Sequence, residues 1–381
     1  MKKSFKYRIY PNSSQRDELD SIFNFCRFLY NSALEERINY YHKYKKSLSY
    51  SDQSKYLPEI KEIFSINNIY SQILQSTLKQ LDLAFKRFFD GIKKTQNVGF
   101  PRFKNKNRFK SINFPQIYNP SGGGIKLISN SKIKIFGING SIKLKMHRPM
   151  QGIAKQCRIV KQDDKYFVSF SCDNVPKNIL PKTHKITGID LGIDNFATLD
   201  DGTKFHHPKP YKTAKEKLAY RQRKLALKQK GSNNYKKQKS LISKIHYKIV
   251  NIRNDYQHKL SKDLVKTYDK IIVEKLNINK MLKDKNIKVK NFNIQDASWG
   301  NFVNKISYKA ENAGKELIKV NPMNTSKMCS CCGLINKELT LQDRIFRCRC
   351  GIEMDRDTNA AKNILALGTS VADSILRSSS L

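Results

Sequence analysis

The fold of the second half of this chain is decided by the segment Ile186-Thr-Gly-Ile-Asp190-Leu-Gly-Ile-Asp-Asn195-Phe-Ala-Thr-Leu199. Two apolar runs are separated by glycine, aspartate and asparagine, a pattern typical of a strand, a tight turn and a second strand. The first run ends on a carboxylate, that of Asp190. Taken alone, an acid after an apolar strand is more often a turn residue or a salt-bridge partner than a reactive group.

Two further acids occupy comparable positions. Glu274 follows the apolar run Lys270-Ile-Ile-Val273, and Asp357 lies in Asp355-Arg-Asp-Thr-Asn359, a pattern typical of a helix N-terminus. Because the three acids are far apart in the sequence, only a tertiary fold can bring them together. Phosphodiester cleavage by two Mg²⁺ ions about 3.5–4 Å apart needs such shared carboxylates. As an ordered set in a basic chain, the acids favour a nuclease.

The charge of the chain indicates its partner. Its 381 residues include 73 Lys or Arg against 32 Asp or Glu, a net charge of +41, which a polyanion such as nucleic acid would screen. Residues 204–248 hold fifteen Lys or Arg and one acid, Glu216. We expect helices at 214–230 and 235–253 with a phosphate-tracking surface; the alternative is a lysine-rich composition and a solvated face.

The first half has a different texture. Alternating residues predict a strand at 2–10, and Asn12-Ser-Ser-Gln15 predicts a helix start. Helical spacing continues to about residue 97, and short strands, including 133–136, 142–146 and 166–170, fill 125–172. We expect a β-rich domain over 1–180 with a helical insertion at about 14–97. A boundary near 176–184 would separate it from a second domain over 181–381, and the length allows such a division.

Aromatic residues alternate with cations after Gly99. Phe100-Pro-Arg-Phe-Lys104 is followed by Phe109 and Phe114. Such a segment can stack on bases and hold phosphates. A strand-rich segment with a basic outer face is an equally good interpretation.

Five of the eight cysteines cluster, in Cys329-Ser-Cys331-Cys332-Gly333 and Cys348-Arg-Cys350-Gly351. Two close thiol pairs, each followed by glycine, predict a structural Zn²⁺ site, because tetrahedral zinc takes four thiolates and glycine lets the backbone fold around the ion. The expected ligands are Cys329, Cys332, Cys348 and Cys350. Cys331 is an alternative to Cys329, although the C-x-x-C spacing favours the latter. A disulfide or a catalytic cysteine fits this pattern less well.

The remaining cysteines and the composition bound the class of protein. Cys26, Cys157 and Cys172 lie in apolar surroundings and are expected in the core. A hydrophobic content of 39% with 10% aromatic residues is too high for a disordered chain. The chain has no apolar run of membrane-spanning length and no apolar stretch after its basic start, so we expect a cytoplasmic, nucleoid-associated protein without membrane contact. Nothing in the sequence specifies an oligomeric state.

These motifs, in this order, closely resemble the TnpB family, the OrfB-type proteins of insertion sequences, which are related to the type V CRISPR effectors. The resemblance rests on Gly-Ile-Asp190-Leu-Gly, Ile-Val-Glu274-Lys-Leu, Thr325-Ser-Lys-x-Cys-x-x-Cys332-Gly, Cys-x-Cys350-Gly and Asp355-Arg-Asp-x-Asn-Ala-Ala-x-Asn-Ile364. Looser landmarks are Tyr10-Pro-x-x-x-Gln15, Tyr30-Asn31, Gly99-Phe-Pro-Arg-Phe-Lys104, His147-Arg-Pro149 and Asp296-x-x-Trp299.

The resemblance implies a multidomain fold of mixed α/β and β character. It implies an RNase H-like RuvC domain with a zinc ribbon inserted at about 325–352, and an N-terminal β-barrel wedge with a helical recognition insertion. The second thiol pair here is C-x-C where many relatives have C-x-x-C, which shortens one knuckle.

The resemblance also implies an activity. The family uses a transposon-derived guide RNA to find double-stranded target DNA, and it cuts that DNA with Mg²⁺. Asp190, Glu274 and Asp357 match its first, second and third metal-binding acids, with Asp355 as the rival for the third and a possible helix cap. The rival functions are a nuclease-dead RNA-guided repressor, a DNA-joining transposase, and a zinc-ribbon DNA-binding factor.

Overall fold

The computed structural model describes residues 1–106, 108–117, 123–162, 164–277, 281, 288–340 and 342–378. The chain divides into two compact units, 1–176 and 177–381, and each is described by itself. Among the helices of the described residues, none combines the length and the apolarity needed to cross a membrane.

The first unit is built on a seven-stranded antiparallel sheet with the order β2-β6-β7-β1-β5-β4-β3. Its strands are β1 (Lys3–Tyr10), β2 (Ser111–Phe114), β3 (Ile125–Ser129), β4 (Lys132–Ile135), β5 (Ile142–Lys145), β6 (Ile153–Gln162) and β7 (Lys165–Asp173). The alternation expected at 2–10 is confirmed: Phe5, Tyr7 and Ile9 are buried, whereas Lys6 is exposed. The strands expected at 133–136, 142–146 and 166–170 are present as β4, β5 and β7.

The sheet curls so that its two edges approach one another. Gly124, immediately before the edge strand β3, lies against Phe114 of the other edge strand, β2, and against Tyr70, which precedes α4. A Cβ atom there would stand 2.5 Å from the ring of Tyr70 and 2.6 Å from the ring of Phe114 in β2. The lack of a side chain at Gly124 therefore permits this close approach, and the sheet forms a half-barrel.

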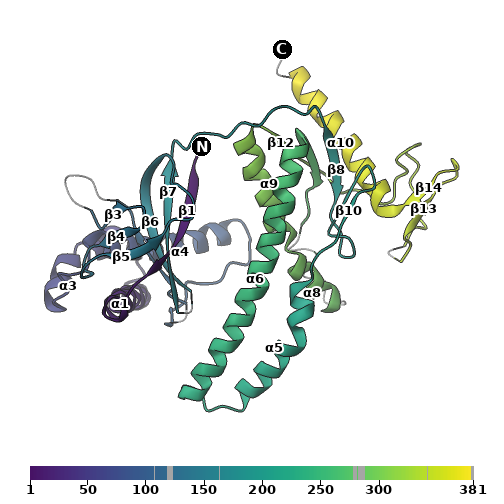
Figure 1. Cartoon of the computed structure of the whole chain (residues 1–381). Helices are drawn as coiled ribbons and strands as arrows, with labels where there is room; N and C mark the ends of the chain where they lie inside the picture. The colour runs from purple at the N-terminus through teal and green to yellow at the C-terminus, as the bar shows by residue number, and fades with distance from the viewer. Residues whose placement is uncertain are drawn as a thin grey trace. The chain divides into compact units, whose positions relative to one another are not determined.

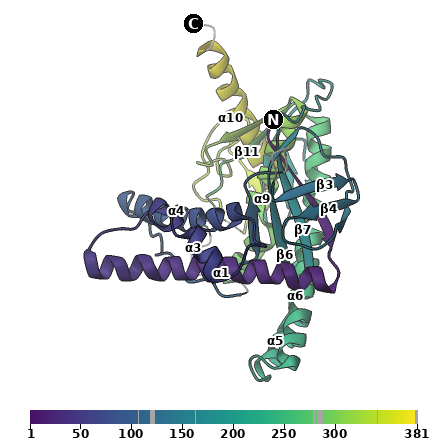
Figure 2. The ribbon, with the colours of Figure 1, turned by 90° about the vertical axis from the view of Figure 1, so that its left-hand side faces the viewer.

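A helical segment lies between β1 and β2. It contains α1 (Ser13–Tyr44), α2 (Tyr50–Ser54), α3 (Leu57–Ile63) and α4 (Ser71–Lys93). Figure 2 shows α1 and α4 side by side along this unit. The helix start expected at Asn12 is a capping box, in which Asn12 accepts from the N–H of Gln15 and the Gln15 side chain accepts from the N–H of Asn12.

The aromatic and basic segment after Gly99 divides between its two interpretations. Phe109 and Phe114 are buried in the core, and β2 is the strand expected there. Phe100 and Phe103 are exposed. Cys26, Cys157 and Cys172 are core residues, as predicted.

The second unit holds a five-stranded sheet with the order β10-β9-β8-β11-β12. Its strands are β8 (Ile186–Asp190), β9 (Ala197–Leu199), β10 (Lys204–Phe205), β11 (Lys270–Glu274) and β12 (Glu316–Val320). β8, β11 and β12 are parallel, whereas β9 and β10 return antiparallel. The strand, turn and strand expected at 186–199 are therefore present as β8 and β9.

Helices cover both faces of this sheet. They are α5 (Pro210–Ala226), α6 (Asn233–Thr267), α8 (Lys288–Ala297), α9 (Trp299–Ala313) and α10 (Arg356–Ser378). Ile271 and Val273 of β11 join the core that α6 and α9 share, whereas Ile272 packs with Ile364 of α10. Burial from both sides explains the continuous apolar run of β11.

The basic helical pair differs from expectation in its ends. Figure 1 shows α5 and α6 side by side, projecting from the sheet. α6 extends to Thr267 rather than to residue 253, because its last turns bury Leu260, Leu264 and Val265 in the core of the unit. α5 begins at Pro210, a residue whose fixed φ suits the first turn of a helix.

Candidate active site and metal centre

Asp190 and Glu274 end two neighbouring parallel strands. In β8 and β11, Ile189 is paired with Val273, and each acid is the next residue. Because parallel strands end at the same edge of a sheet, both carboxylates are delivered to that edge.

Asp357 reaches the same edge from α10. It is the second residue of this helix, which packs against β8, and one of its carboxylate oxygens accepts a hydrogen bond from Asn195 Nδ2 at 3.4 Å. Arg356 Nη2 lies 3.7 Å from its other oxygen. Acids from β8, β11 and α10 thus meet where the turn after β8 contacts the start of α10.

The electrostatics of the group follow from this meeting. Burial, and then the negative charges of Glu274 and Asp357, raise the pKa of Asp190 to about 8, while Arg356 acts in the opposite direction. Burial also raises the pKa of Glu274, and the hydroxyl of Thr325 opposes that rise. Like-charged carboxylates held together in this way favour the binding of a divalent cation, which relieves their repulsion.

Asp355, the alternative to Asp357 as the third acid, makes two contacts of a different kind. Its Oδ1 accepts the backbone N–H of Thr358 at 3.0 Å and caps α10, and its Oδ2 accepts from Lys204 Nζ at 2.7 Å. Partial burial alone would raise the pKa of Asp355, but the bonds from Lys204 and Thr358 outweigh it and hold this pKa below its ordinary value. The structure therefore shows Asp355 as the N-terminal cap of α10, one of the two roles expected for it.

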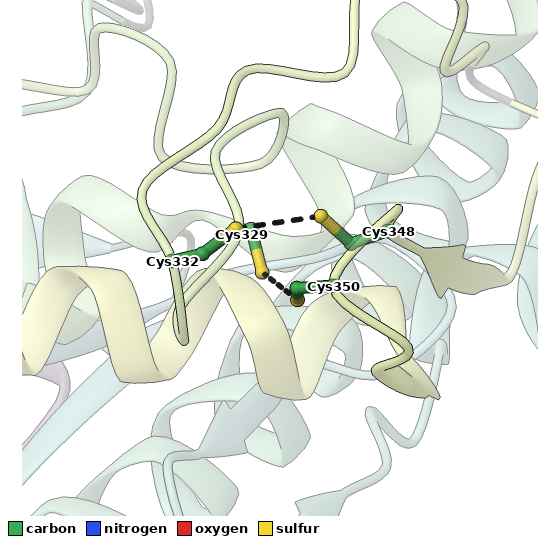
Figure 3. Close-up of side chains that lie close together, drawn as sticks. All are labelled: Cys329, Cys332, Cys348 and Cys350. Carbon is green, nitrogen blue, oxygen red and sulfur yellow. Dashed lines mark hydrogen bonds between the residues drawn. The ribbon is translucent and has the colours of Figure 1, made fainter.

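The second constellation is the four-cysteine group of Figure 3. The sulfurs of Cys329, Cys332, Cys348 and Cys350 all lie within 4.8 Å of one another. The Cys329–Cys350 distance is 3.7 Å and the Cys332–Cys348 distance is 3.5 Å. Four sulfurs bound to tetrahedral zinc at about 2.3 Å lie about 3.8 Å apart, so the spacing fits zinc. Within the described part of the chain, no other group of His, Cys, Asp or Glu converges this tightly.

The backbone of the two knuckles explains their glycines. Gly333 donates to the carbonyl of Cys329 and Gly351 to that of Cys348, both at 3.0 Å, with φ of 76° and 88°. A side chain is strained at such φ values. The shortened C-x-C pair still closes, and Cys331 lies outside the group. Burial alone would raise the pKa of the Cys329 thiol, but the backbone N–H groups of Cys332 and Cys331 outweigh it and lower this pKa to about 7.

Two hollows adjoin the sheet edge that carries Glu274. One, of about 900 Å³, is lined by residues that follow or end β11 and β12, including Lys275, Asn277, Lys319 and Asn321. The other, of about 170 Å³, shares Lys275 and Lys319 and reaches Glu274 and Trp299. Both hollows therefore place the same two lysines beside the strand end that carries Glu274.

Sequence reasoning missed the polar side chains that hold the site together. Thr325 bonds to Glu274, and Asn359 and Asn363 of α10 bond to the backbone before the first zinc knuckle. The signal was present as two asparagines four residues apart, which share one face of a helix. Buried amides on such a face require partners, and this could have indicated a docking role.

Three parts of the chain match known protein families. Residues 169–285 match a family described as "Probable transposase" (OrfB_IS605), residues 299–364 match "Cas12f1-like, TNB domain", and residues 1–46 match "Helix-turn-helix domain" (HTH_OrfB_IS605). In the structure, the last of these ranges contains β1 and the whole of α1.

Two relatives match over nearly the full length of the chain, and a third matches over part of it. The chain is 31% identical to "Putative RNA-guided DNA endonuclease InsQ" of Escherichia coli K12, over 97% of this chain and 92% of that protein. It is 31% identical to a Streptomyces pristinaespiralis protein described as "Putative RNA-guided DNA endonuclease", over 97% and 90%. It is 30% identical to "CRISPR-associated endodeoxyribonuclease Cas12f1" of Sulfoacidibacillus thermotolerans, over 60% and 57%.

A solved structure gives the same architecture. The protein of a Cas12f1-sgRNA-target DNA complex superposes with a TM-score of 0.60 at 16% identity, covering 96% of this chain and 98% of that one. The mixed α/β, multidomain fold expected from the sequence is therefore confirmed. With full-length relatives, matching family models and the ordered motifs in agreement, the chain belongs to the TnpB family, the OrfB-type proteins of insertion sequences.

Proposed function

We propose that this chain is an RNA-guided DNA endonuclease of a transposable element that hydrolyses phosphodiester bonds of target DNA with Mg²⁺. The observation that carries the proposal is that β8, β11 and α10 bring Asp190, Glu274 and Asp357 to one sheet edge, in a chain 31% identical over 97% of its length to relatives named as putative RNA-guided DNA endonucleases. Each acid alone is a weak signal, but three acids gathered where β8, β11 and α10 meet repel one another unless a cation lies between them.

The units take the following roles in this proposal. Residues 181–381 form a RuvC-like nuclease domain with a zinc ribbon at about 325–352, of which Leu341 lies outside the described residues. The order β10-β9-β8-β11-β12, with an acid at the end of each central parallel strand, supports this assignment. Residues 1–180 form the wedge domain with its recognition insertion, supported by the half-barrel sheet and by α1 to α4.

Asp190, Glu274 and Asp357 would hold the catalytic metal, two Mg²⁺ ions by family resemblance. When bound, Mg²⁺ activates the attacking water and stabilises the leaving oxygen. The chain itself supplies the ligands and their placement. Asn195 holds Asp357, Thr325 holds Glu274, and the cap formed by Asp355 fixes the start of α10. Cys329, Cys332, Cys348 and Cys350 would bind structural Zn²⁺, leaving no open position for chemistry.

The nucleic-acid partners are a transposon-derived guide RNA and double-stranded target DNA. Base pairing would choose the target, while the protein holds the heteroduplex by its backbone and shape. The exposed cations of α5 and α6 supply a surface for phosphates. The groove lined by Lys275 and Lys319 leads to Glu274 and would guide the strand to be cut.

The test is cleavage by protein purified with its co-purifying RNA. That RNA is sequenced, and a plasmid carrying the matching target is incubated with the complex and Mg²⁺. Asp190→Ala should abolish cleavage and leave RNA binding intact. Asp194→Ala is the matched control, since Asp194 lies in the same turn but is exposed and pairs with Arg344. Cleavage by Asp190→Ala would contradict the site assignment, and joined DNA ends would favour a transposase.

A further inference from the structure

We propose that Thr325 is a positioning residue for Glu274, and that Asn363 in turn fixes Thr325, so that α10 places two of the three acids. Asp357 is carried by α10 directly. Glu274 is held indirectly, through side chains that belong to the base of the zinc ribbon. This inference rests on the proposed function, because it concerns how the acid site is kept ready for its metal.

The first contact joins Thr325 to Glu274. Thr325 is 1% exposed, and its hydroxyl donates to Glu274 Oε1. The carbonyl of Pro322, at 3.2 Å, is the competing acceptor for the one hydroxyl proton, and its contact is the longer of the two. A glutamate on a strand end has several rotamers. A buried hydroxyl on one carboxylate oxygen selects one of them and leaves Oε2 as the oxygen for a cation.

The second contact joins Thr325 to α10. Asn363 is 2% exposed, and its Nδ2 donates to the carbonyl of Thr325 at 2.8 Å and to that of Met328 at 2.6 Å. Asn359, one turn earlier, donates to the same Met328 carbonyl at 2.7 Å and accepts from the N–H of Ser330 at 2.9 Å. Two buried amides therefore clamp residues 325–330 on one face of the helix.

The clamped segment also contains the first zinc ligand. Cys329 lies between Met328 and Ser330, both of which bond to the amides of α10. The zinc knuckle and the acid site consequently share one short piece of backbone. Folding of the knuckle around its metal would hold that backbone in place and, through Thr325, the carboxylate of Glu274. Groups that orient a metal ligand in this way typically contribute 10–100-fold to metal affinity.

The experiment measures Mn²⁺ binding to the zinc-loaded full chain by electron paramagnetic resonance, with Mn²⁺ as the spectroscopic probe of the acid site. Asp190→Asn defines the signal that depends on the acids. Thr325→Val removes the hydroxyl with little change of shape, and Thr325→Ser retains it. Thr369→Val is the matched control, because among the described residues the hydroxyl of Thr369 bonds to carbonyls of its own helix, those of Leu365 and Ala366. Zinc content reports whether the ribbon of each variant is intact.

We expect Thr325→Val to retain zinc. Its half-saturation should need about 10–100-fold more Mn²⁺ than that of the wild type. Thr325→Ser should restore the wild-type affinity, and Thr369→Val should not alter it. In a Glu274→Gln background, Thr325→Val should cause no further loss, because Thr325 acts through that carboxylate.

Two results separate this inference from the proposed function. Equal Mn²⁺ affinity of Thr325→Val and wild type would overturn the positioning role and leave the acid site standing. Wild-type protein without any Mn²⁺ signal that Asp190→Asn removes would overturn the acid site itself. If Thr325→Val loses zinc, the test rests on Thr325→Ser and on Thr325→Val in the Glu274→Gln background. A further loss of Mn²⁺ affinity in that background would contradict the inference.

Discussion

Gly188 of β8 lies directly against Ala361 of α10. A Cβ atom on Gly188 would stand 2.3 Å from the carbonyl oxygen of Ala361 and 2.6 Å from the backbone nitrogen of Leu365. Gly368, two turns later, meets Ile272 of β11 in the same way, with a Cβ position 2.4 Å from that side chain. These contacts seat α10 on the strands that carry Asp190 and Glu274, and so set where Asp357 lies.

Gly188→Ala should displace α10 and destabilise the second unit. The obstacle is backbone rather than a flexible side chain, so we expect a loss of about 1–3 kcal/mol in the free energy of unfolding, with a fall in cleavage. Chemical denaturation measures the first and plasmid cleavage the second. Gly99→Ala is the control, since its nearest neighbour would be 3.8 Å away. Equal stability of Gly188→Ala and wild type would disprove the close packing.

Cys332→Ser should lose zinc and lower the thermal midpoint of the second unit, because one of four converging thiolates is removed. Cys331→Ser should keep both, although Cys331 is the immediate neighbour and is also exposed. Metal analysis of the purified variants, together with thermal unfolding, distinguishes them. Zinc at full stoichiometry in Cys332→Ser, or its loss from Cys331→Ser, would show that the ligand set is wrong.

Asp269 should make the second unit sensitive to acid. Burial alone would raise the pKa of Asp269. Lys315 and the N–H groups of Thr183 and His184 outweigh it and hold this pKa well below its usual range. Its stabilisation is therefore present above the unfolded pKa of about 4 and is lost as pH falls below it.

Asp269→Asn should accordingly reduce stability at pH 6 and narrow its difference from wild type at pH 3. Denaturant midpoints at the two pH values measure this. Asp255→Asn serves as a control, because Asp255 pairs with Lys259 on the exposed surface of α6. A constant difference between Asp269→Asn and wild type across this range would refute the assignment.

Lys319→Ala should weaken binding of the DNA strand that enters the groove beside Glu274. The Asp190→Ala background is expected to bind without cutting, and in it the affinity of Lys319→Ala for single-stranded DNA should fall. The slope of log affinity against log salt should decrease by about 0.7, the value for one phosphate contact. Lys337→Ala, an exposed lysine in the ribbon but outside the groove, should match its parent. Unchanged affinity and slope in Lys319→Ala would argue against this path.

Local patterns carried much of the fold. β1, the capping box at Asn12, β8 and the cysteine knuckles are set by neighbours in sequence, and each was predictable from a few residues. The length of α6 was not, because its last turns are helical where they bury Leu260 and Leu264 against distant residues. Periodicity alone in so polar a segment does not reveal that burial.

The sequence by itself indicated the four thiols that converge, since each thiol pair spans a single turn of backbone and a glycine with positive φ closes it. It also determined which acids to consider. Only the tertiary structure shows that α10 brings Asp357 to the turn after β8, that Asp355 caps this helix, and that Thr325 bonds to Glu274. The physical reason is range: a knuckle forms among adjacent residues, whereas the acid cluster exists only after β8, β11 and α10 have packed.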